Sequence, residues 1–189
     1  MEAVVVQGLT YQYQPGGPFV LKGLDFQVGR GEIVVVTGLS GCGKSTLCFC
    51  LSGAIRHNRD GVMAGEVVVN GKNIREMRGA SLALEVGMVF QDPDTQLFSP
   101  TVEDEIAFAP ENLCLPPDRI RETVDHVLDL LGIAALREAN PYQLSGGEKQ
   151  QVALAAVLAL DPPVLIVDEV MSQLDAGGRK KVAAVLERL

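Results

Sequence analysis

The hydrophobic pattern changes along the chain, from strand-like in the first third to helical further on. Val-rich or alternating stretches at 3–7, 20–28, 33–37 and 66–70 are separated by Gly and Pro and predict β-strands. The run Ile33 to Thr37 is nearly unbroken, which is typical of a strand covered on both faces in a parallel sheet. The next segment expected to be helical runs from Lys44 to Ala54.

The middle of the chain is patterned for helices. Thr101 with Asp104 is a helix-start signal, and 117–131 has apolar residues at helical spacing. A third helix is expected at 146–160 and a last one at 178–189. Two short apolar runs, Val86 to Phe90 and Val164 to Val167, predict buried strands on either side of this region. The pattern indicates an α/β chain with a helical insert.

Composition narrows the class of protein. The 189 residues suffice for one domain, and the formal charge of −8 is the wrong sign for binding nucleic-acid phosphates. No apolar stretch is long enough to cross a bilayer, and the N-terminus has no signal-peptide pattern, so cytosolic residence is expected. The four cysteines lack disulfide or metal-pair spacing and are expected to be reduced thiols.

A glycine-rich loop stands between the predicted strand 33–37 and the predicted helix that follows. Its pattern is GxxxxGK[ST], whose glycines let backbone N–H groups and the helix N-terminus point at phosphate oxygens. Lys44 is expected to reach the β- and γ-phosphates, and the Ser45 hydroxyl to bind Mg²⁺. An ordinary glycine turn remains the alternative. The residues expected to contact ATP are Gly38, Ser40, Gly41, Cys42, Gly43, Lys44, Ser45 and Thr46.

Two carboxylates follow the apolar run Val164 to Val167. The carboxyl ends of such strands line ligand crevices in open α/β sheets. Asp168 is expected to hold Mg²⁺, directly or through water, and Glu169 to accept a proton from an attacking water. The alternative is an ordinary solvated strand end.

The sequence Leu144-Ser145-Gly146-Gly147-Glu148 closely resembles the signature motif of ABC ATPases. The resemblance implies a P-loop NTPase fold with a RecA-like, mostly parallel sheet, an N-terminal antiparallel β subdomain and an inserted α-helical subdomain. It also implies that Ser145, Gly146 and Gly147 contact the γ-phosphate of ATP bound to a second ABC domain, in a homo- or heterodimer. A capped helix start is the alternative for this motif.

Further positions match the same family in order. Gln91 resembles the Q-loop glutamine, which senses Mg²⁺ and the attacking water, and Ser172 to Asp175 resembles the D-loop, in which Asp175 helps to position the partner's site. Tyr13 matches the aromatic residue that stacks on adenine, and Tyr11 is the weaker candidate. The resemblance implies a single domain over 1–189, with the β-rich and P-loop core at about 1–91 and 161–189 and the helical insert at about 92–160.

Two stretches are similar to a narrower group, the ATPases of energy-coupling factor (ECF) importers. They are 53–67, which includes His57 as a loop residue rather than a metal ligand, and 91–108. This likeness implies that a helix of a transmembrane transporter subunit docks near 91–109. It implies a peripheral place on the cytoplasmic face of the membrane, reached only through that partner.

The chain departs from the family at a few points. Val170 replaces the usual proline, and Gln151 stands where an arginine is common. The switch histidine that would contact the γ-phosphate is not found, so we expect a domain incomplete at its C-terminus that binds Mg-ATP weakly and hydrolyses it slowly. Two other functions stay open: a soluble ABC-type ATPase of DNA maintenance or translation, and a nucleotide-binding module without hydrolysis.

Overall fold

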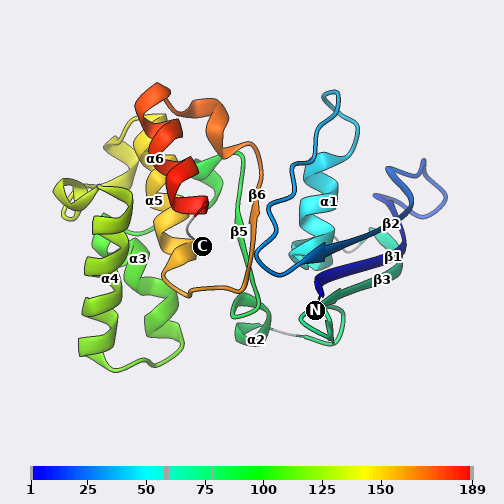
Figure 1. The fold of residues 1–189 in the computed structure, drawn as a ribbon, viewed down its shortest axis with the longest axis horizontal. Helices are drawn as coiled ribbons and strands as arrows, with labels where there is room; N and C mark the ends of the chain where they lie inside the picture. The colour runs from blue at the N-terminus through cyan, green and yellow to red at the C-terminus, as the bar shows by residue number, and fades with distance from the viewer. Residues whose placement is uncertain (1, 58–59, 78, 188–189) are drawn as a thin grey trace. The chain divides into compact units, whose positions relative to one another are not determined.

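The computed structural model describes residues 2–57, 60–77 and 79–187. The chain forms two compact units, Met1–Met88 with Pro163–Ile166 and Val89–Pro162 with Val167–Leu189 (Figure 1). Within the described residues, no helix combines the length and the apolar content that a membrane span requires. The expected helical insert at 92–160 falls in the second unit, and its extent as a subdomain stays a prediction.

An antiparallel sheet with the strand order β2-β1-β3-β4 dominates the first unit. The strands are β1 (Glu2–Gln12), β2 (Leu21–Gly29), β3 (Val62–Val69) and β4 (Lys72–Asn73). The buried alternation of β1 passes from Val4 and Val6 to Leu9 and Tyr11 across Gly8, where the register with both neighbours shifts. Such a change marks a β-bulge. Gly65 is needed opposite it, because its φ is +87° and an added Cβ would lie 2.4 Å from the Gly8 carbonyl oxygen.

A helix and the sheet share the core of this unit. Helix α1 (Lys44–Leu51) continues into the 3₁₀ turn η1 (Ala54–His57). Leu47 and Cys50 belong to the same buried cluster as Leu9 and Val67 of the sheet. Burial raises the pKa of the Cys50 thiol to about 12, which keeps the thiol neutral in the core.

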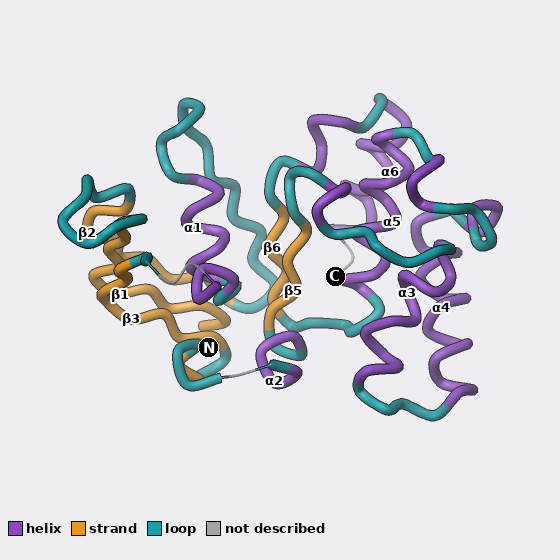
Figure 2. Tube along the Cα trace, turned by 180° about the vertical axis from the view of Figure 1, so that it is seen from behind, coloured by secondary structure: helices purple, strands orange, loops and turns teal. Residues whose placement is uncertain are grey.

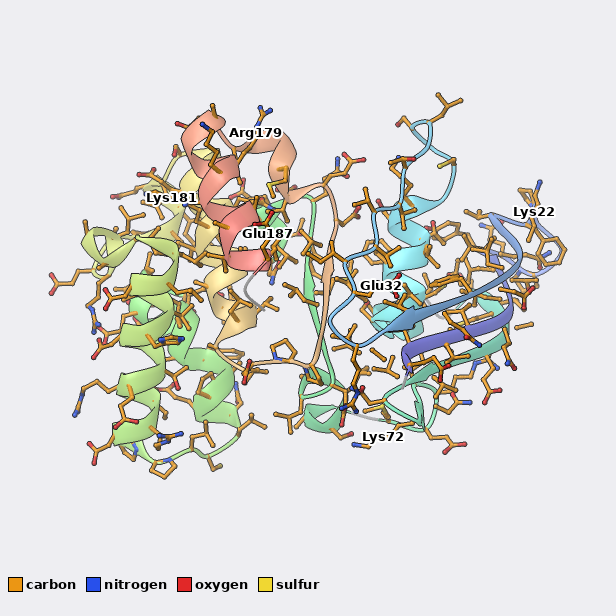
Figure 3. The ribbon with its side chains drawn as sticks, in the orientation of Figure 1. Lys22, Glu32, Lys72, Arg179, Lys181 and Glu187 are labelled. Atoms are coloured by element: carbon orange, nitrogen blue, oxygen red, sulfur yellow. The ribbon has the colours of Figure 1, made fainter. Side chains whose placement is uncertain are left out.

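A second sheet pairs β5 (Val86–Val89), which follows the short helix α2 (Ala80–Ala83), with β6 (Val164–Val167). The two strands run in the same direction (Figure 1). The prediction of a buried strand at Ile33–Thr37 is wrong, because this segment lies outside any strand and the Val35 side chain is 78% exposed. An apolar run becomes a buried strand only where other strands and layers cover it, and none of the described strands pairs with this one. The segment follows a turn in which Gly29 N donates to Glu32 Oε2 at 2.7 Å (Figure 3).

Helices build the second unit (Figure 2). Helix α3 contacts α4 and α5, and α4 also contacts α5 and α6. The helices are α3 (Val102–Asn112), α4 (Pro117–Leu131), α5 (Gly146–Leu158) and α6 (Ala176–Leu186), with 3₁₀ turns η2 (Pro93–Thr95), η3 (Ala134–Leu136), η4 (Pro141–Gln143) and η5 (Val170–Gln173).

The helix boundaries follow from local chemistry. The Thr101 side chain accepts from Asp104 N at 3.1 Å and caps α3 as predicted. Helix α4 begins with a proline in its first turn and ends at Gly132, whose left-handed backbone closes the helix. Its buried face is formed by Val124, Val127, Leu128 and Leu131. The last two residues of the helix predicted at 178–189 lie outside the described residues.

Candidate functional site

The glycine loop in the first unit ends at the N-terminus of α1. Gly41 and Gly43 have φ angles of +78° and +102°, a left-handed backbone that glycine adopts readily. Gly43 is the N-cap of α1, no side chain caps the helix, and its first turn carries no acidic residue. The positive end of the helix dipole is therefore uncovered by any carboxylate, which suits an anionic group such as a phosphate.

Lys44 adds a positive charge to this loop. Its ammonium group donates to the carbonyl oxygens of Gly38 and Leu39, both at 3.2 Å, and so lies across the loop. Gly38 is tightly fitted, because an added Cβ would come within 2.7 Å of the Cys42 sulfur. The loop thus brings one ammonium group and a helix N-terminus together, and these groups fit the phosphates of ATP.

Val20 and Leu21, where strand β2 begins, pack against the last glycine of the loop. A Cβ added at Gly43 would lie 3.1 Å from Val20 Cγ1 and 3.3 Å from Leu21 Cδ2. Both the backbone conformation and the packing at this position therefore require glycine.

Two tyrosines predicted as alternatives for adenine binding differ sharply in exposure. Tyr11 is 1% exposed and belongs to the core, whereas Tyr13 is 44% exposed. The two rings pack edge to face, with centroids 5.0 Å apart. The Tyr13 hydroxyl also forms a hydrogen bond with Thr46 Oγ1 at 2.9 Å, which ties this ring to the first turn of α1. Of the two, only Tyr13 has a ring face accessible to a ligand.

In the second unit, two hydrogen bonds join the residues at the end of β5 to those that follow β6. Asp168 is 4% exposed, and its backbone N–H donates to the Val89 carbonyl at 3.0 Å. Glu169 is exposed and has a left-handed backbone with φ of 54°, which is uncommon for a residue with a side chain. Its Oε2 accepts from Gln91 Nε2 at 2.8 Å. The structure therefore pairs the two residues predicted to handle the attacking water.

The signature residues begin α5. Ser145 is the N-cap and forms a capping box with Glu148, in which Glu148 N donates to Ser145 Oγ at 3.4 Å and Ser145 N donates to Glu148 Oε2 at 2.9 Å. Ser145 Oγ donates to the same carboxylate oxygen at 2.7 Å. These hydrogen bonds lower the pKa of Glu148. The capped helix start is observed, and it leaves Gly146 exposed in the first turn.

Asp175 also begins a helix. Its Oδ1 accepts from Gly178 N at 2.6 Å, and Arg179 on the same helix (Figure 3) donates from Nε to the Leu174 carbonyl at 2.8 Å. The side chains of Ser172 and Gln173, in the predicted D-loop, lie outside the described part of the structure, as does that of His57.

Sequence reasoning missed three polar residues that hold this second unit together. Glu105 is 4% exposed and accepts from the backbone N–H groups of Phe98 and Ser99 at 2.9 and 2.7 Å. Gln150 is fully buried and donates to the Phe90 carbonyl at 3.1 Å, and Lys149 binds Asp94 at 2.6 Å. The sequence carried one signal for such residues, a polar residue that interrupts the apolar positions of a predicted helix.

Comparison with known proteins relates the chain to one family. The family described as ABC transporter matches residues 21–172. A relative from Pyrococcus abyssi is 41% identical over 189 residues, covering 100% of this chain and 68% of the relative. One from Geobacter sulfurreducens is 43% identical, covering 97% and 71%. Both are named provisionally as ABC transporter ATP-binding proteins. The chain spans only 31% of a similarly named protein from Methanosarcina mazei, at 43% identity over 97% of the chain.

Solved structures give the same relationship. The structure of cbiO1 from Clostridium perfringens, described as part of the ABC transporter complex cbiONQ, has a TM-score of 0.83 and 36% identity, covering 99% of this chain and 73% of that one. A bacterial Atm1-family ABC exporter with ATP bound has a TM-score of 0.81 and 28% identity, covering 98% of this chain and 32% of that one.

Proposed function

The chain belongs to the ABC transporter family of ATP-binding domains, and from this premise we propose that it binds and hydrolyses ATP to power uptake by an ECF-type membrane transporter. One observation carries the proposal: the glycine loop places an ammonium group and an uncapped helix N-terminus together. This arrangement complements a concentrated negative charge such as a triphosphate.

The loop and the tyrosine beside it have separate roles in this proposal. Lys44 binds the β- and γ-phosphates, and the backbone N–H groups of 40–46 surround the phosphate oxygens. Ser45 is proposed to hold Mg²⁺, which would offset negative charge on the phosphates. Tyr13 is proposed to stack on adenine, because its ring is exposed and hydrogen-bonded to the helix that follows the loop.

The second unit supplies the groups proposed for hydrolysis. Glu169 accepts a proton from the attacking water, and Gln91 fixes the carboxylate through the 2.8 Å hydrogen bond to its Oε2. Gln91 is also proposed to bind Mg²⁺, as is Asp168. Asp168 is almost fully buried at the end of β6, next to Glu169, and carboxylate oxygens are ligands that Mg²⁺ prefers.

A second ABC domain is the first proposed partner. Ser145, Gly146 and Gly147 would contact the γ-phosphate held by that domain through the N-terminus of α5, and Asp175 would contact the partner's site. The capping box uses the N–H groups of Ser145 and Glu148, so the proposed phosphate contacts are with the N–H groups of Gly146 and Gly147. A dimeric ATP-binding cassette with ADP and phosphate bound shares the fold, at a TM-score of 0.83 and 24% identity.

A helix of a transmembrane subunit is the second proposed partner. It would dock near 91–109, on the cytoplasmic face of the membrane. Three exposed aromatic side chains of the second unit support this site: Phe98 (55% exposed), Phe108 (45%) and Tyr142 (57%). The Phe98 and Phe108 rings pack edge to face at 4.6 Å, and Tyr142 OH donates to the Leu97 carbonyl at 3.3 Å. Exposed aromatic groups of this kind are typical of protein interfaces.

Cysteine labelling tests nucleotide binding directly. Cys42 in the loop and Cys114 at the end of α3 are both exposed thiols, so Cys114 is an internal control. We expect Mg-ATP at about ten times its dissociation constant to slow alkylation of Cys42 roughly tenfold, by occupancy of the loop. Alkylation of Cys114 should be unchanged, and Lys44→Ala should remove the protection. Equal alkylation of Cys42 with and without Mg-ATP would refute nucleotide binding at this loop.

Hydrolysis needs a separate measurement, because a binding module could give the same protection. In Glu169→Gln we expect phosphate release to fall roughly a hundredfold or more, the scale of a lost general base, while Cys42 protection persists. Unchanged phosphate release in this variant would favour a nucleotide-binding module without hydrolysis. Co-purification with a membrane protein, rather than with DNA or ribosomes, tests the transporter assignment.

A further inference from the structure

Gln150 is a buried amide in the apolar part of α5. It is 0% exposed, as are the neighbouring residues 152–155. Its Nε2 donates to the Phe90 carbonyl at 3.1 Å. Within the described part of the chain, its Oε1 is buried and has no hydrogen-bond partner.

Stability alone does not account for a glutamine at this position. A buried carbonyl oxygen without a donor destabilises a fold, whereas an unbranched apolar side chain such as methionine would fill the same space without that cost. The glutamine does make one specific contact, and this contact is with the peptide that directly precedes Gln91. The amide is therefore distinguished by the segment that it holds, the backbone at Phe90.

A second bond joins the same two segments. Lys149 Nζ lies 2.6 Å from Asp94 Oδ1, and the Lys149 side chain is only 15% exposed. Both links start on α5, in the turn that follows Ser145, and both end within 90–94. Gln91, within the same segment, donates to Glu169 Oε2.

We propose that Gln150 is a positioning residue that couples the N-terminus of α5 to the Gln91–Glu169 pair, with Lys149 as a second link. This inference rests on the roles proposed above for Ser145, Gln91 and Glu169. When a phosphate group of the nucleotide held by a second domain binds at the start of α5, the displacement of α5 is passed through Phe90 to Gln91. The amide of Gln91 then orients the Glu169 carboxylate.

Three variants test the coupling. Gln150→Met removes the donor and the unpartnered oxygen together, so the two effects on stability oppose each other. Gln151→Met is the matched control, because it makes the same change at the next, half-buried position of α5. Lys149→Met removes the second link from a partly exposed position, so the inference can still be tested if Gln150→Met folds poorly.

Hydrogen exchange gives a readout that does not depend on activity. We expect the peptide 89–97 to exchange roughly tenfold faster in Gln150→Met than in the unchanged chain, the factor for one lost hydrogen bond of ordinary strength. Lys149→Met should act on the same peptide in the same direction. Exchange of 117–131 in α4 should be unchanged in all variants, and Gln151→Met should match the unchanged chain throughout.

Steady-state kinetics supply the second readout. A positioning role predicts that Gln150→Met lowers kcat roughly tenfold with little change in KM for ATP. Unchanged exchange in 89–97, or faster exchange everywhere together with a lower Tm, would overturn the proposal. If the unchanged chain releases no phosphate from ATP, the proposed hydrolysis fails, while the exchange of 89–97 still decides whether Gln150 holds this segment.

Discussion

Replacing Gly43 by alanine tests whether the nucleotide loop is fixed by its glycine and by strand β2 together. At φ of +102° the unfavourable backbone conformation of an alanine costs about 1–2 kcal/mol. Its Cβ would also meet Val20 Cγ1 at 3.1 Å and Leu21 Cδ2 at 3.3 Å. Overpacking of this kind adds about 1–3 kcal/mol, and the restriction of the unfolded chain by alanine offsets about 0.4–1 kcal/mol, so the free energy of unfolding should fall by about 3 kcal/mol.

Gly41 provides the control within the same loop. Its φ is +78°, but an added Cβ meets nothing within 4 Å. Gly41→Ala therefore has only the free-energy cost of the backbone conformation, which is reduced by about 0.4–1 kcal/mol because alanine restricts the unfolded chain. We expect the free energy of unfolding to fall by about 1 kcal/mol in this variant.

Urea unfolding followed by far-UV circular dichroism measures both variants, since the chain has no tryptophan for fluorescence. The difference between the two alanine variants isolates the contacts with Val20 and Leu21. Equal destabilisation of the two variants would show that β2 does not support the loop, and the packing argument would be wrong.

Three further predictions concern buried or hydrogen-bonded groups. Iodoacetamide at pH 8 should modify Cys114 and leave Cys50 intact in the native chain. The free energy of unfolding should also fall as the pH rises from 9 toward 12, because the thiol of Cys50 ionises at a lower pH in the unfolded chain than in the folded one. Because the pKa of Glu148 is lowered in the folded chain, the Glu148 carboxylate stabilises the fold above pH 4.5, and this stabilisation is lost as the pH falls through the pKa of the folded chain. Glu148→Gln should therefore flatten the acid side of a Tm-against-pH profile. Glu105→Leu should lower the free energy of unfolding by about 1–3 kcal/mol in urea titrations, because two backbone N–H groups lose their acceptor; an unchanged midpoint would contradict this.

Local signals predicted the helices of the chain well. The apolar residues at helical spacing over 117–131 gave the same bounds that the structure shows for α4, Pro117–Leu131. Thr101 and Ser145 were recognisable as helix starts, because capping depends on residues three positions apart.

Features that depend on residues far apart in the sequence were predicted less well. Ile33–Thr37 has the composition of a buried strand, but composition cannot show whether another strand pairs with it. The hydrogen bond from Gln91 to Glu169 joins residues 78 apart in the sequence, and the family motif alone suggested that the two act on the same water. Gln150 and Glu105 have polar side chains whose partners are backbone atoms of other segments, so no spacing pattern reveals them.

The exposed run Ile33–Val36 has a practical consequence for handling the protein. Four consecutive β-branched residues with exposed side chains form a segment with high β-propensity and no charge. Such segments pair with copies of themselves and start aggregation. The apparent molar mass from light scattering should therefore rise with the concentration of the purified chain, and a single Val35→Lys substitution should suppress that rise. Purification buffers and concentration limits should be chosen with this segment in mind.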